Sequence, residues 1–245
     1  MHPGLYRVVR FLGSSLFALL LVMIVQQPMA LAKNDRDLEM WLPVTLDAHV
    51  TPHIRFQGEV QTRLGDNISQ MDRLLIRGAV GAQITKSFSL WQGYGWVPSF
   101  EKLNVKQDTF EENFNNENRL YQQAMFENQW SKLKIVNRTR LEERFIDNTS
   151  GTSVRARHMV RLVYPITPSG KLSGVVYDEF FINLNHLRVG PQAGFDQNRL
   201  FVGLNQKLFK YTSLEAGYLW NPVNVFKSSI NRTNHIILIG LNVKV

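Results

Sequence analysis

The chain of 245 residues contains no cysteine, which excludes disulfides, thiolate metal sites and a thiol nucleophile. Beyond residue 32 it also lacks any apolar run near the roughly 20 residues that a membrane-spanning helix needs. Sustained helical periodicity is scarce over the same part of the chain. We therefore expect the chain after residue 32 either to be soluble or to cross a membrane as strands.

The first 32 residues have the form of a secretory signal peptide. Arg7 and Arg10 precede an apolar stretch from 11 to 25, and Ala30-Leu31-Ala32 supplies a small-residue exit. An uncleaved membrane anchor is the alternative, but the apolar core of about fifteen residues is short for a spanning helix. We expect cleavage after Ala32, leaving an exported chain of one domain, residues 33–245.

Basic residues outnumber acidic ones. The chain has 28 Lys and Arg against 20 Asp and Glu, and loss of Arg7 and Arg10 leaves 26 basic residues. Such a surplus favours anionic lipid or acidic solutes as partners. Export makes nucleic acid the least suitable partner.

The mature chain shows repeated segments of ten to thirteen residues in which apolar and polar side chains alternate, the pattern of antiparallel β-strands. These segments are longer than ordinary globular strands and suit tilted strands that cross a bilayer. Short turns alternate with longer Asn-, Asp- and Gly-rich connections, as in outer-membrane barrels with periplasmic turns and external loops. The predicted strands are 54–64, 71–84, 88–99, 118–130, 133–145, 153–164, 171–183, 197–208, 212–222 and 233–244.

These segments predict an all-β, antiparallel, up-and-down transmembrane barrel of about ten strands. An even number is expected where both termini lie in the periplasm. The segment 38–50 also alternates and would be an eleventh strand or a lumenal segment. A further strand within one of the long loops, such as 100–117, would raise the number to twelve.

Alternation places most charged residues on one face of the strands, which in a barrel is the lumen. In 133–145, for example, Leu133, Ile135 and Leu141 oppose Arg138 and Arg140. The predicted lumen-facing residues are Arg55, Glu59, Arg63, Arg73, Arg77, Arg119, Glu127, Arg138, Arg140, Glu142, Arg144, Arg155, Arg157, Arg161, Glu179, Arg199 and Glu215. They indicate either a lattice of Arg and Glu that fills a narrow barrel or an anion-attracting pore or pocket.

Two further features fit a barrel. Alternating apolar residues from Ile237 to Val245 resemble the terminal strand that barrel-assembly machinery recognises, although the chain ends on valine and not phenylalanine. Aromatic residues near predicted strand ends suit interfacial girdles facing the lipid. These are Trp91, Tyr94, Trp96, Trp130, Tyr164, Tyr177, Tyr211, Tyr218 and Trp220.

Several short motifs occur in a fixed order along the chain. They are Arg138-Thr139-Arg140-Leu141-Glu142-Glu143-Arg144, Arg155-Ala156-Arg157, Tyr177-Asp178-Glu179-Phe180-Phe181, Asn198-Arg199, Glu215-Ala216-Gly217-Tyr218 and Asn234-His235. In this order they resemble the domain-of-unknown-function 2490 family over roughly residues 40–245. The resemblance implies an outer-membrane barrel of Gram-negative bacteria and brings no established activity.

Catalytic and metal-binding patterns are weak. His235, with Asn234 beside it and Ser228 and Ser229 before it, is the best candidate for a lipid-directed enzyme, but the serine of a His-x-Ser-Asn strand motif is missing. No histidine pair has metal-ligand spacing. Gly78, Gly81, Gly93 and Gly95 mark places where strands bend or approach closely.

The leading hypothesis is thus a non-enzymatic barrel without cofactor or metal, either conducting or binding anionic solutes or serving as a structural envelope component. A lipid-modifying enzyme and a soluble, carbohydrate-binding β-sandwich are the alternatives.

Overall fold

The computed structural model describes residues 33–102, 112–224 and 230–245. The predicted signal peptide and its cleavage site lie outside these residues. Among the described residues no helix has the length and hydropathy needed to cross a membrane.

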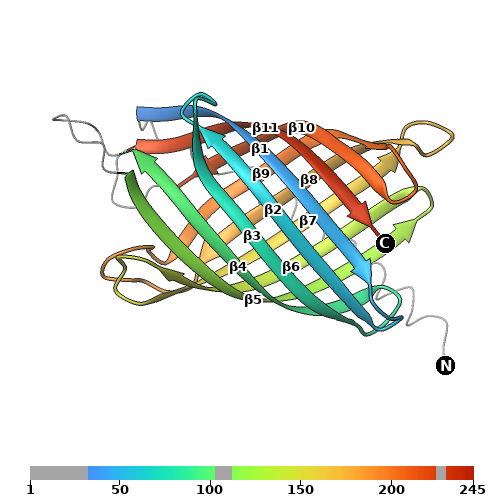
Figure 1. Cartoon of the computed structure of the whole chain (residues 1–245), viewed down its shortest axis with the longest axis horizontal. Coiled ribbons are helices and arrows are strands. Elements are labelled where there is room, and N and C mark those ends of the chain that lie inside the picture. The colour runs from blue at the N-terminus through green and yellow to red at the C-terminus, as the bar shows by residue number, and fades with distance from the viewer. Residues whose placement is uncertain (1–32, 103–111, 225–229) are drawn as a thin grey trace, which may run out of the picture. The chain divides into compact units, whose positions relative to one another are not determined.

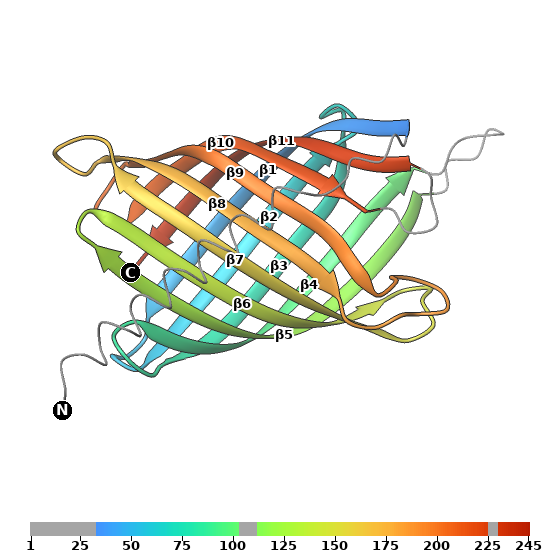
Figure 2. The ribbon, with the colours of Figure 1, turned by 180° about the vertical axis from the view of Figure 1, so that it is seen from behind.

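The described chain forms one closed barrel, which confirms the predicted all-β fold class. Each strand from β1 to β11 pairs antiparallel with the next along the chain (Figures 1 and 2). The strands are β1 (Lys33–His49), β2 (Ile54–Gly65), β3 (Gln70–Gln83), β4 (Phe88–Lys102), β5 (Glu112–Trp130), β6 (Leu133–Ile146), β7 (Thr152–Pro165), β8 (Leu172–Asn183), β9 (Gly194–Lys207), β10 (Thr212–Val223) and β11 (Ile230–Lys244).

The described residues form eleven strands, one more than the ten outlined in the sequence and one fewer than the alternative of twelve. The extra strand is the 38–50 segment, which extends back to Lys33 as β1. β1 closes the barrel against β11, and the arrows of these two strands point the same way in Figure 1. An even number of strands is expected only when both termini lie at the same end of the barrel. Here β1 and β11 run parallel, and a parallel pair, with evenly spaced slanted hydrogen bonds, can also close a sheet.

Several strands extend beyond their predicted bounds into the long connections. β4 continues to Lys102 and β5 begins at Glu112, so much of the predicted loop 100–117 is strand. β9 likewise begins at Gly194, inside the predicted loop 184–196. Asn113, Asn115 and Asn116 concealed the start of β5, and Gly194 and Asp196 that of β9, because Asn, Asp and Gly are depleted in strands generally.

The two faces of the barrel wall differ in the way the alternation predicts. The outer face carries exposed aliphatic side chains such as Val60, Val80 and Val202. Charged residues point inward, but so do two apolar clusters that the sequence did not indicate. One contains Trp41, Val175, Phe201, Leu219, Ile236 and Leu238, and the other contains Ala79, Trp91, Tyr121, Met125, Val136 and Met159.

The inward aromatic rings lie against glycines on neighbouring strands. A Cβ added to Gly81 would meet the Trp91 ring at 2.4 Å, and one added to Gly93 would meet the Tyr121 ring at 2.1 Å. Gly81 and Gly93 therefore mark close approaches, as predicted, whereas a Cβ on Gly78 or Gly95 would meet no atom closer than 3.4 Å. Trp91 and Tyr177 themselves were wrongly assigned to lipid-facing girdles, because proximity to a strand end does not specify which face a side chain occupies.

Candidate functional site

All seventeen residues predicted to face the lumen line cavities inside the barrel. Period-two alternation was sufficient to place them, since successive side chains of a strand point to opposite faces. What alternation could not supply is which of them meet across the lumen.

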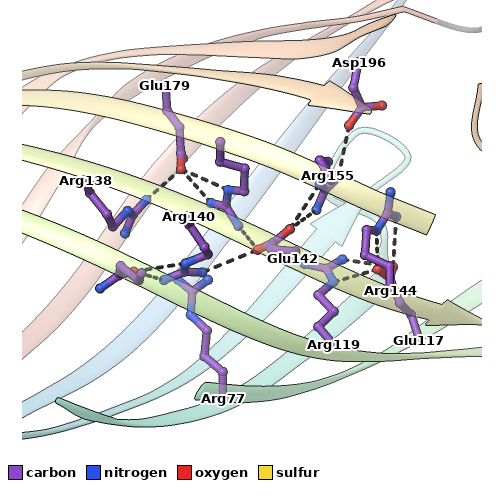
Figure 3. A network of polar contacts seen from close by, with 12 residues as sticks. Arg77, Glu117, Arg119, Arg138, Arg140, Glu142, Arg144, Arg155, Glu179 and Asp196 are labelled. Atoms are coloured by element: carbon purple, nitrogen blue, oxygen red, sulfur yellow. Dashed lines mark hydrogen bonds and ion pairs between the residues drawn. The ribbon is translucent and has the colours of Figure 1, made fainter. Parts of the chain in front are cut away.

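Much of the charge is organised around Glu142 of β6. Its Oε2 accepts from Arg155 at 2.7 Å, and its Oε1 accepts from Arg157 and lies 3.5 Å from Arg140 (Figure 3). The Glu142 side chain is almost fully buried. Removing a carboxylate from three guanidiniums at once would leave buried charge uncompensated, which costs several kcal/mol in typical proteins.

Glu179 of β8 forms the second node of this lattice. Its Oε1 accepts from Arg157 at 2.8 Å and from Arg138 at 2.7 Å. Arg157 therefore links Glu179 to Glu142 directly. The chain Glu142, Arg157, Glu179 and Arg138 joins β6, β7 and β8 on the inner wall.

Other ion pairs connect strands that are not neighbours. Arg55 of β2 donates to Glu127 of β5 at 3.0 Å, and also to Asp47 at 2.8 Å. Arg161 of β7 pairs with Glu215 of β10. These ion pairs join strands that do not lie side by side in the sheet.

Four acidic residues inside the barrel were not among the predicted ones: Glu39, Asp47, Glu117 and Asp196. Glu117 accepts from Arg119 at 2.7 Å and from Arg144, and Asp196 accepts from Arg155 at 3.0 Å. Both had been placed in loops, and Glu39 and Asp47 fell in the segment of uncertain role. Extending the alternation of 118–130 by one residue would have found Glu117, and applying it to 38–50 would have found Glu39 and Asp47. Asp196 lies at a shift in the register between β8 and β9, which alternation does not reveal.

With these acids included, most of the lumenal arginines have a carboxylate partner. Among the described residues, the exceptions are Arg63 and Arg199, whose side chains donate to glutamine oxygens instead. Lysines add further positive charge near the short turns. Lys207 and Lys244 are not within ion-pair distance of any carboxylate in the part of the chain that the structure describes.

One cavity of about 870 Å³ follows the interior. Near one end its lining includes Lys132, Gly170 and Lys210, which belong to the short turns between strands. Near the other end it includes Arg63 and Arg73. None of the described residues in the connections 66–69, 147–151 and 184–193 lines it, so within the described structure the cavity reaches the rim at the short-turn end.

Tyr177 of β8 is one of the side chains that line this cavity. Tyr177 packs against both apolar clusters, one formed by β1 and β8–β11 and the other by β3–β7. Its ring stacks on Phe201, with centroids 4.8 Å apart. One side chain of β8 thus contacts both clusters.

The histidine singled out in the sequence lies on the outer face. The Tyr218 hydroxyl and Nδ1 of His235 are 2.5 Å apart. Ser228 and Ser229 lie outside the described residues. Among the described residues no group of His, Asp and Glu has the arrangement of a metal site.

Fold and interior together define a closed β-barrel with a charged, partly filled lumen. The family model described as "Protein of unknown function (DUF2490)" matches residues 38–233, and the chain belongs to this family, as the ordered motifs predicted. An uncharacterised protein of Methylorubrum extorquens is 30% identical over 217 residues, covering 88% of this chain and 91% of the relative.

Among solved structures, the barrel is similar to outer-membrane expressed OmpT of Vibrio cholerae, with a TM-score of 0.41, 12% identity and coverage of 70% of this chain and 56% of that one. In-vitro folded OmpT gives a TM-score of 0.39 at 11% identity, covering 72% and 77% of the two chains. The siderophore receptor PirA of Pseudomonas aeruginosa gives a TM-score of 0.29 at 16% identity, covering 72% and 32%. These likenesses carry no inference about activity.

Proposed function

We propose that this protein is a non-enzymatic outer-membrane β-barrel that binds small anionic solutes in its lumen. The predicted signal peptide directs export, and strands of 12 to 19 residues are long enough to cross a bilayer. An aliphatic outer wall around a charged interior is the arrangement of a lipid-embedded barrel. Outer-membrane lipid is its expected surrounding, and the alternating terminal strand its expected signal to the assembly machinery.

The observation that carries the binding proposal is the charge along the cavity. Basic side chains line it throughout. Those without a carboxylate partner in the described structure lie toward both ends: Lys132, Lys207, Lys210 and Lys244 near the short turns, and Arg63 and Arg199 toward the longer connections. Confinement between low-dielectric walls focuses such a positive potential and concentrates anions. In an outer-membrane orientation with periplasmic turns, solutes enter from the periplasm.

A binding pocket fits the interior better than an open pore. Ion pairs such as Arg55 with Glu127 cross the lumen, and Tyr177 contacts both apolar clusters. A pore needs a continuous water-filled path, which these side chains obstruct. The lattice of Arg and Glu and the anion-attracting cavity therefore occur together in one lumen.

Binding is tested with the refolded barrel in detergent micelles and a panel of anionic, neutral and cationic solutes of similar size. Titration calorimetry should show saturable binding of anions that weakens as salt is raised, because screening reduces the attraction. Lys207→Gln combined with Lys244→Gln should slow association. Equal binding of neutral and anionic solutes, or no binding of any, would overturn the proposal.

Pocket and pore are separated by conductance in planar bilayers. The wild-type barrel should conduct little, and Tyr177→Ala should raise the current by removing the side chain that connects the two clusters. Tyr164→Ala is the matched control, because Tyr164 lies on the outer face and is 53% exposed. A large, chloride-selective current from the wild-type barrel would instead establish the pore.

A further inference from the structure

Arg63 and Arg199 stand apart from the other lumenal arginines. Nε and Nη2 of Arg63 donate to Oε1 of Gln61, at 3.0 and 2.8 Å, and Nη2 of Arg199 donates to Oε1 of Gln197 at 3.3 Å. Amide oxygens satisfy hydrogen bonds but neutralise no charge. Nε of Arg199 is buried and has no hydrogen-bond partner in the described structure.

Trp41 holds these two arginines close together. The guanidinium carbon of Arg63 lies 3.7 Å from the centroid of the Trp41 ring, and that of Arg199 lies 4.8 Å from it. Arg199 also lies over Phe181, at 4.5 Å. Cation–π contacts of this kind offset part of the desolvation of a guanidinium, on the order of 1–2 kcal/mol, but leave its charge in place.

The acid that contacts Trp41 forms no ion pair with either of these arginines. Trp41 Nε1 donates to Glu39 at 2.6 Å. Glu39 forms no ion pair within 4.0 Å among the described residues, in contrast to Glu142 and Glu179. Its carboxylate accepts the hydrogen bond from the indole instead.

A third arginine adds to the positive charge. Arg73 of β3 is directly opposite Arg63 of β2 in the register, on the same inner face. Its Nε donates to Ser99 Oγ at 3.0 Å, and its nearest carboxylate, on the adjacent Asp72, is 3.9 Å away. Like charges directly opposite on neighbouring strands are destabilising unless something compensates them.

We infer that Arg63, Arg73 and Arg199 form a binding site for a doubly charged, phosphate-type oxyanion. The site lies toward the end of the cavity that is away from the short turns. All three residues line that cavity. Planar guanidinium groups present paired N–H donors that match the oxygens of phosphate or carboxylate, a geometry that chloride cannot use. This inference rests on the proposed function and adds the position of the site and the class of its ligand.

Inorganic phosphate is the probe, titrated into the refolded full-length barrel at constant ionic strength, with sulfate and chloride as comparisons. Phosphate should bind more tightly than chloride. Arg199→Gln and Arg63→Gln should each weaken phosphate binding about tenfold, the effect of one charged hydrogen bond. Arg199→Lys should recover only part of the loss, because it keeps the charge without the planar donor pair.

The matched control is Lys171→Gln, which removes an exposed cation of a short turn that does not line the cavity. It should leave phosphate affinity within about twofold of wild type. Heat-modifiable migration on a denaturing gel confirms that each variant is folded, and variants at Arg63 and Arg199 should pass because they break no ion pair.

The outcomes separate the two proposals. If phosphate affinity falls in the Lys207→Gln, Lys244→Gln double variant but not in the arginine variants, anions bind in the cavity but the arginine site is wrong. If anions bind without any preference for phosphate or sulfate over chloride, the arginine site is likewise wrong while binding in the cavity stands. Absence of binding by every anion overturns both.

Discussion

The backbone amide of His49 donates a hydrogen bond to the carbonyl oxygen of Val245, 2.9 Å away. The backbone amide of Val245 donates in turn to the backbone carbonyl oxygen of Asp47, 3.0 Å away. One residue thus bonds to two residues spaced by two on the other strand, the pattern of a parallel pair. The last residue of the chain is therefore part of the seam that closes the barrel.

His49→Pro should weaken this seam, because proline has no amide hydrogen to donate. We expect a loss of about 1–3 kcal/mol in the free energy of unfolding, measured by urea titration in lipid vesicles. His49→Ala keeps the amide and should stay close to wild type. Equal loss in both variants would show that the imidazole, and not the backbone bond, matters.

Glu142→Gln should destabilise the barrel strongly. It leaves Arg155 and Arg157 without their shared carboxylate in a buried environment, for which about 3–5 kcal/mol is typical. Glu143→Gln, at the next position and on the outer face, should have little effect. Thermal unfolding followed by circular dichroism gives the comparison, and similar melting temperatures for the two variants would contradict a stabilising lattice.

Gly203→Ala should reduce stability through steric conflict with backbone that has little freedom to move. The added Cβ would lie 2.5 Å from the carbonyl oxygen of Ala216 and 2.9 Å from Cα of Gly217. Overpacking of this kind costs about 1–3 kcal/mol. Gly95→Ala, also inward-facing, meets no atom closer than 3.4 Å and should be tolerated; the yield of refolded barrel measures both.

Val60→Arg tests whether the outer wall contacts lipid. Val60 lies in the middle of β2 and is 47% exposed, and arginine at the bilayer midplane costs about 2–4 kcal/mol. Val50→Arg, in the turn after β1, should cost little, since a side chain near the interface reaches water. Unfolding in vesicles measures the difference. If the two variants are equally stable, the outer wall does not face hydrocarbon.

The amino-acid sequence by itself determined the barrel class and the inward set of charged residues. Both follow from alternation, which is a local property: whether Arg140 and Glu142 share a face depends only on their spacing within one strand. The family motifs are equally local.

The tertiary structure decided the properties that depend on closure. Parallel pairing of β1 with β11 set the number of strands at eleven, and extension of β5 and β9 brought Glu117 and Asp196 into the lattice. Partners such as Arg161 and Glu215 are far apart in the sequence, and only the curvature of the closed sheet brings them together. The same closure places Arg199 and Arg63 on one indole ring without an ion pair to either of them in the described structure, which alternation within any single strand does not reveal.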